Sequence, residues 1–203
     1  MRFNTLFTTG IAALCVWALT ANAEPITSER ATFEVETVAK GLKNPWGLTF
    51  LPDGSMVVTE RAGTMRVVSA DGDLGPALTG LPEIFVRGQG GLLDIAADPD
   101  YANTGRLFFS YSEAGKGGNS TALASAKLSG DALTDLKVSF RQQPKFESNA
   151  HFGSRIVFAD NKTLFLTLGD RYSRMDDAQT LDNHHGKVVR IHKDGSVPTD
   201  NPT

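Results

Sequence analysis

His151 is the first residue whose type and position could support catalysis, because it lies in the segment 149–155, just before an apolar run that is expected to be a strand. A neutral imidazole can take a proton from an alcohol near neutral pH, which makes His151 a candidate general base. Loops at strand entrances are also where β-rich folds keep functional groups. The alternative is a histidine that only shapes a turn, and the small residues around it do not exclude this.

Two other polar side chains occupy comparable positions. Gln89 lies in a glycine-rich segment, 87–91, ahead of another apolar run. Glycines let a backbone approach a ligand closely, and the amide can donate and accept hydrogen bonds; the alternative is a flexible loop. Arg171, preceded by Asp170, follows the apolar segment 163–168, where the two could hold an anionic ligand or a cation. A turn cap or a surface ion pair is the alternative for them.

The remaining histidines and the familiar catalytic motifs give weaker signals. His184 and His185 are adjacent, so in an extended chain they face opposite ways and cannot easily share one metal ion. Zinc requires three or four convergent ligands, and we therefore predict structural roles for both residues. The sequence contains no Gly-x-Ser-x-Gly and no His-Glu-x-x-His motif. No helix is expected after Gln89, so the glycines there do not predict a phosphate loop.

Short β-rich segments must position these side chains. Segments 47–50, 55–59 and 64–69 are separated by Pro-Asp-Gly and Ala-Gly turns, which predicts an antiparallel meander. Strand–turn–strand patterns recur at 91–111 and 154–168. The alanine-containing segment 121–128 is predicted to be a strand, with a glycine-rich hairpin tip at 114–119 before it. Four-stranded units at this spacing favour the blades of a β-propeller, with a β-sandwich as the alternative.

Composition narrows the class of protein. The chain has 203 residues, of which 40% are hydrophobic and 21% charged, and its net charge is −3. These values exclude disorder and give no broad cationic field for nucleic acid. The strands suffice for about three blades and part of a fourth, and an open arc would expose blade faces and strand edges. We therefore expect residues 24–203 to be the N-terminal part of a truncated propeller domain.

The first 23 residues are predicted to be a secretory signal peptide. Arg2 is followed by the apolar run 11–19 and by Ala21-Asn22-Ala23, which fits a cleavage site. A membrane anchor is the alternative, but nine apolar residues are too few to cross a bilayer of roughly 30 Å. Cleavage would remove Cys15, the single cysteine, and leave no membrane span. We expect a periplasmic or secreted protein that folds without disulfides.

Several motifs in order carry a resemblance that extends from about residue 33 to 202. They are Asn44-Pro45-Trp46-Gly47-Leu48, Leu51-Pro52-Asp53-Gly54, Thr59-Glu60-Arg61-Ala62-Gly63, Gly88-Gln89-Gly90-Gly91-Leu92-Leu93, His151-Phe152-Gly153-Ser154-Arg155, Leu168-Gly169-Asp170-Arg171 and Gly186-Lys187-Val188-Val189-Arg190-Ile191. Together they resemble the soluble quinoprotein sugar dehydrogenases, also called glucose/sorbosone or aldose sugar dehydrogenases. Each motif is weak alone, and the ordered set is fairly specific.

This resemblance implies a fold and an activity. The fold is all-β, a six-bladed β-propeller about twice this length, of which the chain supplies about the first three blades. The activity is oxidation of the C1 hydroxyl of aldose sugars to lactones, with pyrroloquinoline quinone (PQQ) and calcium as cofactors and an external electron acceptor. The calcium ligands and further quinone contacts are expected beyond Thr203, so the chain alone is expected to be inactive.

The resemblance also implies roles for individual residues. His151 falls on the general base, Gln89 on a polar residue that lines the cofactor, and Arg171, a weaker match, on a position facing the quinone's carboxylates. Ala150 departs from the glucose-specific members, which carry an acidic residue there, and this favours a broader range of aldoses.

Two other functions remain open. A metal-dependent propeller lactonase would need several carboxylate and asparagine ligands facing the channel, where this chain offers histidine and glutamine more clearly. A non-catalytic propeller that binds carbohydrate or protein is the other alternative. Quinone-dependent dye reduction with an aldose would separate both from the dehydrogenase.

Overall fold

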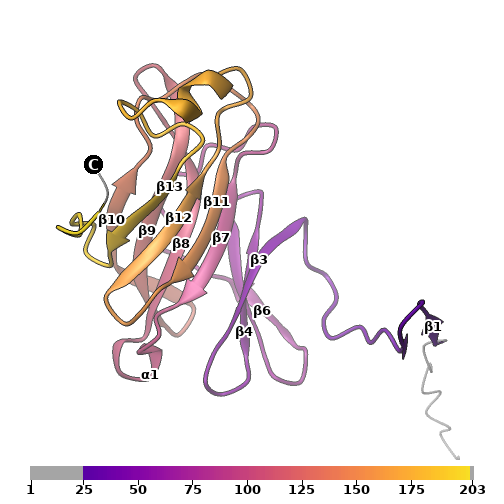
Figure 1. Cartoon of the computed structure of the whole chain (residues 1–203). Helices are drawn as coiled ribbons and strands as arrows, with labels where there is room; N and C mark the ends of the chain where they lie inside the picture. Colours follow the sequence, from indigo (N-terminus) through magenta and orange to yellow (C-terminus); the bar gives the residue numbers. More distant parts are fainter. Residues whose placement is uncertain (1–24, 202–203) are drawn as a thin grey trace, which may run out of the picture. The chain divides into compact units, whose positions relative to one another are not determined.

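The structure, a computed structural model, describes residues 25–201, which fall into two units. The described part of the first, up to Thr37, contains an antiparallel hairpin of β1 (Ile26–Thr27) and β2 (Thr32–Phe33). The second unit begins at Val38 and contains every other element (Figure 1). The predicted signal peptide, 1–23, lies outside the described residues. Between residues 25 and 201 no helix has the length and apolar character needed to cross a bilayer.

Three antiparallel sheets make up the second unit. The first sheet consists of β3 (Pro45–Phe50), β4 (Met56–Glu60), β5 (Thr64–Val68) and β6 (Leu74–Ala77), paired in that order. The second sheet consists of β7 (Leu92–Ala97), β8 (Arg106–Gly115), β9 (Gly118–Ser129) and β10 (Ala132–Arg141). The third sheet consists of β11 (Gly153–Phe158), β12 (Thr163–Leu168) and β13 (Val188–His192).

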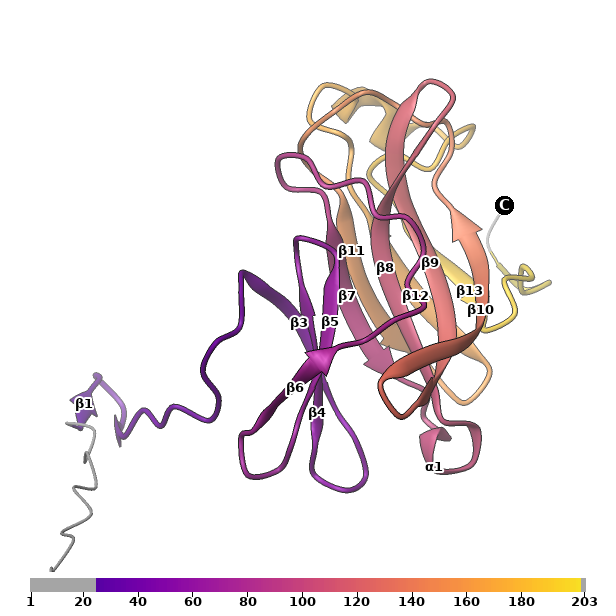
Figure 2. The same cartoon turned by 180° about the vertical axis from the view of Figure 1, so that it is seen from behind.

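Each sheet is a meander, and the first strands of the three sheets lie next to one another. β3 and β11 both pack beside β7, so the first strands of the three sheets are neighbours, as the view from behind shows (Figure 2). Alternating apolar residues place one cluster between the first and second sheets, around Val57, Met65 and Phe109. A second cluster lies between the second and third sheets, around Phe108, Leu123 and Leu166. The second sheet is therefore covered on both faces.

The predicted strands and turns are confirmed, and the described part of the chain is all-β apart from two short helices. Segment 121–128 lies within β9, and the predicted hairpin tip connects β8 to β9. The direct turn expected between β7 and β8 contains a single helical turn, α1 (Tyr101–Thr104), which ends at Gly105 in the left-handed conformation. A 3-10 helix, η1 (Met175–Gln179), lies between β12 and β13. The closed six-bladed ring stays a prediction.

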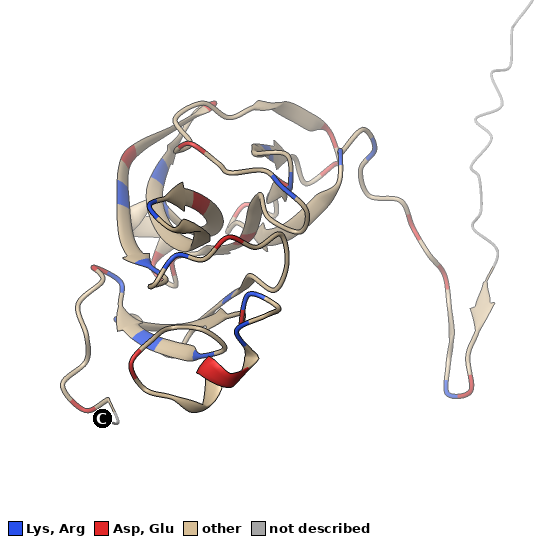
Figure 3. Cartoon of the chain, turned by 90° about the horizontal axis from the view of Figure 1, so that it is seen from above, with Lys and Arg blue, Asp and Glu red and all other residues tan. Residues whose placement is uncertain are grey.

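Charges of both signs are interspersed along the ribbon (Figure 3). Several of the ion pairs among the described residues join strands of one sheet. Glu113, for example, lies 2.8 Å from Arg141 and 2.9 Å from Lys145. Burial would raise the pKa of the Glu113 carboxyl, but these two cations lower it below its ordinary value.

Candidate functional site

The predicted site residues lie in loops at one end of the sheets. Gln89 precedes β7, His151 precedes β11, and Arg171 follows β12, which is antiparallel to β11. The N-terminal ends of first strands and the C-terminal end of β12 meet at this end. The structure therefore brings the three predicted residues together from two sheets.

A side-chain bridge joins Gln89 to His151 across the two sheets. The N–H of His151 donates to Oε1 of Gln89 at 2.8 Å, and the N–H of Gln89 donates to the carbonyl of Asn149 at 2.8 Å. This reciprocal pair fixes the backbone that carries the imidazole. The side-chain nitrogen of Gln89, Nε2, has no hydrogen-bond partner between residues 25 and 201, and the side chain is exposed.

The glycines around Gln89 also allow close packing within the protein, and their approach to a ligand stays a prediction. A Cβ on Gly88 would lie 2.5 Å from the Asn149 carbonyl, and one on Gly90 would lie 2.6 Å from the ring of Phe152. A Cβ on Gly91 would overlap the carbonyl of Arg61. The glycines thus let the protein's own loops pack against each other.

His151 is oriented by an acidic partner. Its Nδ1 lies 2.7 Å from Oδ1 of Asp170, which also accepts the N–H of Tyr172 at 2.9 Å. The hydrogen bond from His151, followed by that from Tyr172, lowers the pKa of the Asp170 carboxyl, which is ionised at neutral pH. An ionised carboxylate only accepts, so Nδ1 of His151 carries the hydrogen. In the neutral ring, Nε2 then holds the free lone pair.

The other ring nitrogen of His151 is accessible. The imidazole is half exposed, and Nε2 has no hydrogen-bond partner in the described part of the chain. The exposed ring of Tyr172 stands at 73° to it, with the ring centroids 5.3 Å apart. A proton acceptor beside an aromatic surface, open to solvent, is what a sugar hydroxyl would need.

Backbone strain is concentrated at the same place. Among residues 25–201, six non-glycine residues have positive φ, and four of these lie at the ends of β11 and β12: His151, Ser154, Arg171 and Tyr172. Such conformations persist where surrounding contacts impose them, often at functional sites.

Arg171 has a position that the sequence did not indicate. Its side chain is fully buried and stacks on the Phe152 ring at 3.7 Å. Nη1 donates to the carbonyl of Ala150 at 2.8 Å, and Nη2 donates to Oδ1 of Asn119 at 2.6 Å and to the carbonyl of Ser148 at 2.8 Å. Burial lowers its pKa to about 10, against the opposing effect of Asp170, so the guanidinium stays charged. Its donors hold the 148–151 loop, and direct contact with a ligand stays a prediction.

His184 and His185 serve the fold, as predicted. Nδ1 of His184 accepts the N–H of Gln143 at 3.0 Å. His185 is fully buried, with Nδ1 at 2.8 Å from Oδ2 of Asp177 and Nε2 at 3.0 Å from the carbonyl of Pro144. No group of three or more metal-ligating His, Cys, Asp or Glu side chains occurs within residues 25–201.

The sequence analysis considered Asp170 as a residue that could hold a ligand or a cation, and it did not predict that Asp170 would orient His151. The register of β11 and β12 pairs Gly153 with Leu168. His151 lies two residues before that pair and Asp170 two residues after it, so a hairpin prediction already places them opposite each other. The signal was present in the spacing.

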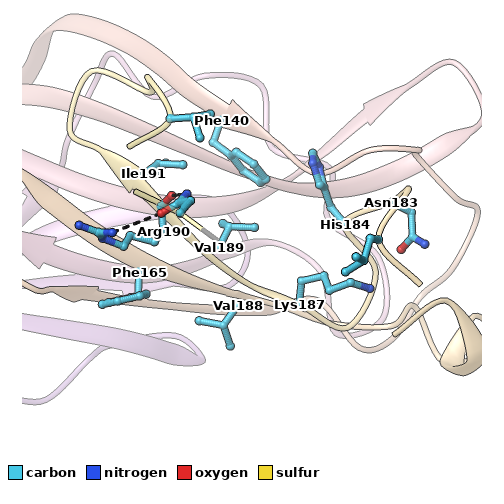
Figure 4. Close-up of a pocket in the computed structure, with 12 residues that line it drawn as sticks. Phe140, Phe165, Asn183, His184, Lys187, Val188, Val189, Arg190 and Ile191 are labelled. Atoms are coloured by element: carbon cyan, nitrogen blue, oxygen red, sulfur yellow. Dashed lines mark hydrogen bonds between the residues drawn. The ribbon is translucent and has the colours of Figure 1, made fainter. Parts of the chain in front are cut away.

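Two cavities lie near these loops but do not include the predicted residues. One, of about 470 Å³, lies along the first strands and is lined by Trp46, Asp94 and Arg155 with their neighbours. The other, of about 410 Å³, lies at the edge strand β13 and is lined by Phe140, Phe165 and Val188 among others (Figure 4). The candidate site is therefore an open rim of loops.

The sequence and the fold match one family consistently. Residues 42–203 match the family model of glucose/sorbosone dehydrogenase. Aldose sugar dehydrogenase YliI of Escherichia coli is 43% identical over 176 residues, which is 85% of this chain and 47% of that protein. The crystal structure of the soluble aldose sugar dehydrogenase from E. coli in the apo-form is 41% identical, with a TM-score of 0.78, over 82% of this chain and 49% of that one.

A structure with bound quinone is also similar. The PQQ-bound form of the aldose sugar dehydrogenase from Streptomyces coelicolor is 30% identical, with a TM-score of 0.70, over 83% of this chain and 50% of that one. The chain thus spans about half the length of the relatives it matches. With its ordered motifs and its three sheets, the chain belongs to the glucose/sorbosone dehydrogenase family.

Proposed function

We propose that this chain provides the proton-accepting half of a PQQ-dependent aldose dehydrogenase site. The observation that carries the proposal is the His151–Asp170 pair, which leaves Nε2 of His151 as an accessible base. Relatives named aldose sugar dehydrogenase, one of them with PQQ bound, support the substrate and cofactor classes.

His151 takes the proton of the sugar's C1 hydroxyl in this proposal. Asp170 keeps the hydrogen on Nδ1, so the lone pair of Nε2 faces solvent, and it stabilises the imidazolium that forms after proton transfer. The quinone, when bound, supplies the two-electron oxidant for the C1 carbon. General-base assistance of this kind contributes roughly 10²- to 10⁴-fold to the rate.

The donor set at the rim fits an anionic quinone. The amide of Gln89 has two hydrogens without partners in the described chain. Among residues 25–201 the Arg61 guanidinium donates only through Nη1, to the carbonyls of Gly88 and Gly90, so its Nη2 remains available nearby. Tyr172 adds an exposed aromatic face. We propose that Gln89 and Arg61 hold the quinone, while Arg171 positions the loop that presents His151.

Calcium has a different status. The described residues contain no group of three or more His, Cys, Asp or Glu side chains that could hold a metal ion. Calcium stays an expectation from the resemblance, as do the lactone product, the external electron acceptor, the periplasmic or secreted location and the closure of a six-bladed ring.

The test measures aldose-dependent dye reduction after addition of PQQ and calcium. It compares the chain alone with the chain joined to the C-terminal half of the E. coli relative. We expect no turnover from the chain alone and quinone-dependent turnover from the joined protein. Lactone hydrolysis without quinone would instead support a hydrolase, and quinone-independent dye reduction would contradict the proposal.

A further inference from the structure

Three buried polar side chains of the second sheet reach the loops that carry His151 and Asp170. They are Asn119 and Thr121 of β9 and Gln142, which directly follows β10, and each is at most 1% exposed. Apolar residues of the second cluster fill much of the interface between the second and third sheets. Polar groups are costly to bury there unless they are hydrogen-bonded, so the role of these side chains follows from what they contact.

Thr121 holds the residue next to the proposed base. Its Oγ1 donates to the carbonyl of Phe152, which directly follows His151, at 2.7 Å. That carbonyl already accepts the N–H of Gly169 across the hairpin at 3.1 Å, so it would be paired without the threonine. The hydroxyl therefore adds an attachment to the second sheet rather than satisfying an unpaired carbonyl.

Gln142 holds the residue next to the acidic partner. Its Nε2 donates to the carbonyl of Gly169, which directly precedes Asp170, at 2.9 Å, and to the carbonyl of His184 at 3.2 Å. Its Oε1 accepts the N–H of Thr121 at 3.2 Å, and its own N–H donates to the Thr121 carbonyl at 2.9 Å. The glutamine and the threonine therefore form one unit, whose two side chains attach to the two ends of the β11–β12 hairpin.

Asn119 acts through Arg171. Its Oδ1 accepts a hydrogen bond from Nη2 of Arg171 at 2.6 Å, and its backbone pairs with that of Phe146 at 3.2 and 3.3 Å. The guanidinium in turn donates to the carbonyl of Ala150 at 2.8 Å and to that of His151 at 3.2 Å. Asn119 thus sets the place of the buried charge that holds the loop around the base.

The backbone at the pair depends on contacts from outside the hairpin. The regular pairing of β11 with β12 ends at Gly153 and Leu168, so His151 and Asp170 lie beyond the last pair of the ladder. His151 has a φ of 51°, which a non-glycine residue adopts only where its surroundings impose it. Without the second sheet the loop would relax, and the 2.7 Å contact between Nδ1 and the carboxylate would be lost.

We propose that Asn119, Thr121 and Gln142 are positioning residues for the His151–Asp170 pair. They fix the ends of the β11–β12 hairpin, so the carboxylate stays within reach of Nδ1 and the neutral ring keeps its lone pair on Nε2. The inference rests on the proposed function only for the use of that lone pair, because the geometry belongs to the chain itself. The second sheet, which carries neither member of the pair, is thereby part of the site.

The first test measures the tautomer of His151 in the purified chain, from the nitrogen NMR shifts of the neutral imidazole. In wild type we expect the hydrogen on Nδ1. Thr121→Val removes the hydroxyl and keeps the shape, and it should shift the population toward hydrogen on Nε2. Thr121→Ser should restore the wild-type state. This measurement requires neither quinone nor turnover.

Thr59→Val is the matched control. Thr59 is also fully buried, and its hydroxyl donates to the carbonyl of Leu93 at 2.5 Å, but it lies between the first and second sheets. Its loss should lower the melting temperature at least as much as Thr121→Val does, since the hydroxyl also accepts the N–H of Gly47 at 2.8 Å. The tautomer of His151 should stay as in wild type.

Turnover of the joined protein is the second test. Thr121→Val should lower kcat about threefold to tenfold, the usual effect of one hydrogen bond, and leave the KM for the aldose unchanged. Gln142→Met and Asn119→Ala should act in the same direction. Asn119→Asp should recover most of the turnover that Asn119→Ala loses, because it retains the oxygen that accepts from Arg171.

The outcomes separate positioning from stability and from the reaction. Variants that lose stability while the wild-type tautomer and kcat persist would overturn the inference, and so would an equal shift of the tautomer in Thr59→Val. A shifted tautomer in Thr121→Val, together with a joined wild type that has no quinone-dependent turnover, would support the positioning and contradict the proposed function instead. If circular dichroism shows one variant unfolded, the other two positions decide, because all three attach to the same hairpin.

Discussion

Two His–Asp pairs of nearly equal length lie in the same chain and do different things. Nδ1 of His151 is 2.7 Å from Asp170, and Nδ1 of His185 is 2.8 Å from Asp177. In both pairs the hydrogen bond from the histidine lowers the pKa of the carboxyl. The pair alone therefore does not define a catalytic site.

The second ring nitrogen makes the difference. His185 is buried, and both of its ring nitrogens are engaged, Nδ1 with the carboxylate of Asp177 and Nε2 with the carbonyl of Pro144. This ring therefore has no unused nitrogen, and it joins η1 to the loop after β10. Nε2 of His151 has no such partner in the described chain and faces solvent. Exposure and one unused nitrogen distinguish the pair that we propose as the catalytic base from the structural pair.

The largest effect should come from His151→Ala. In the joined, active protein we expect turnover to fall by about 10²- to 10⁴-fold, because the proton acceptor is lost. PQQ affinity, measured by fluorescence titration, and the melting temperature should change little, since the imidazole is half exposed. Equal turnover in wild type and variant would show that His151 is not the base.

His185→Ala should give the opposite pattern. It removes a buried ring and two hydrogen bonds, and we expect a loss of about 3 kcal/mol in the free energy of unfolding. Urea denaturation of the purified chain measures this. His192→Ala is the control, since His192 is only partly buried and belongs to neither His–Asp pair. If His151→Ala lowered the free energy of unfolding more than His185→Ala does, the assignment of His185 as the structural histidine would be contradicted.

Asp170→Asn should have a smaller effect on the reaction. The amide keeps the shape but cannot stabilise an imidazolium as a carboxylate does, so we expect kcat to fall about tenfold with PQQ affinity unchanged. The kcat and KM for the aldose separate this positioning role from binding. A rise in KM at constant kcat would assign Asp170 to substrate binding.

The smallest effect concerns acid stability at the buried pair. The hydrogen bond from His185 keeps the pKa of Asp177 below its ordinary value of 3.8. Its ionised form therefore stabilises the fold above pH 3.8, and this contribution is lost as the pH falls through the lower folded value. Wild type should be more stable than Asp177→Asn at neutral pH, and the two should converge in strong acid. If the difference in stability between wild type and Asp177→Asn did not change with pH, the proposed link between the Asp177 pKa and stability would be contradicted.

Local patterns were sufficient for the strands, because turn residues and alternation act over a few residues. The pairing of β11 with β12, which form one hairpin, likewise places His151 opposite Asp170. The contact between Gln89 and His151 depends on the packing of two sheets, so the sequence pattern indicated each residue separately but not their contact. The burial of Arg171 was not foreseen, since it depends on Asn119 and on carbonyls of a loop that no spacing places beside it.

The bridge from Gln89 to the His151 amide has a practical consequence for dynamics. That amide hydrogen is held by a side chain from a neighbouring sheet, so its exchange with deuterium reports how often the seam between β7 and β11 separates. A mutation far from the rim that loosens this seam would tilt the imidazole without touching it. Deuterium uptake at His151 would then rise before any change in global melting.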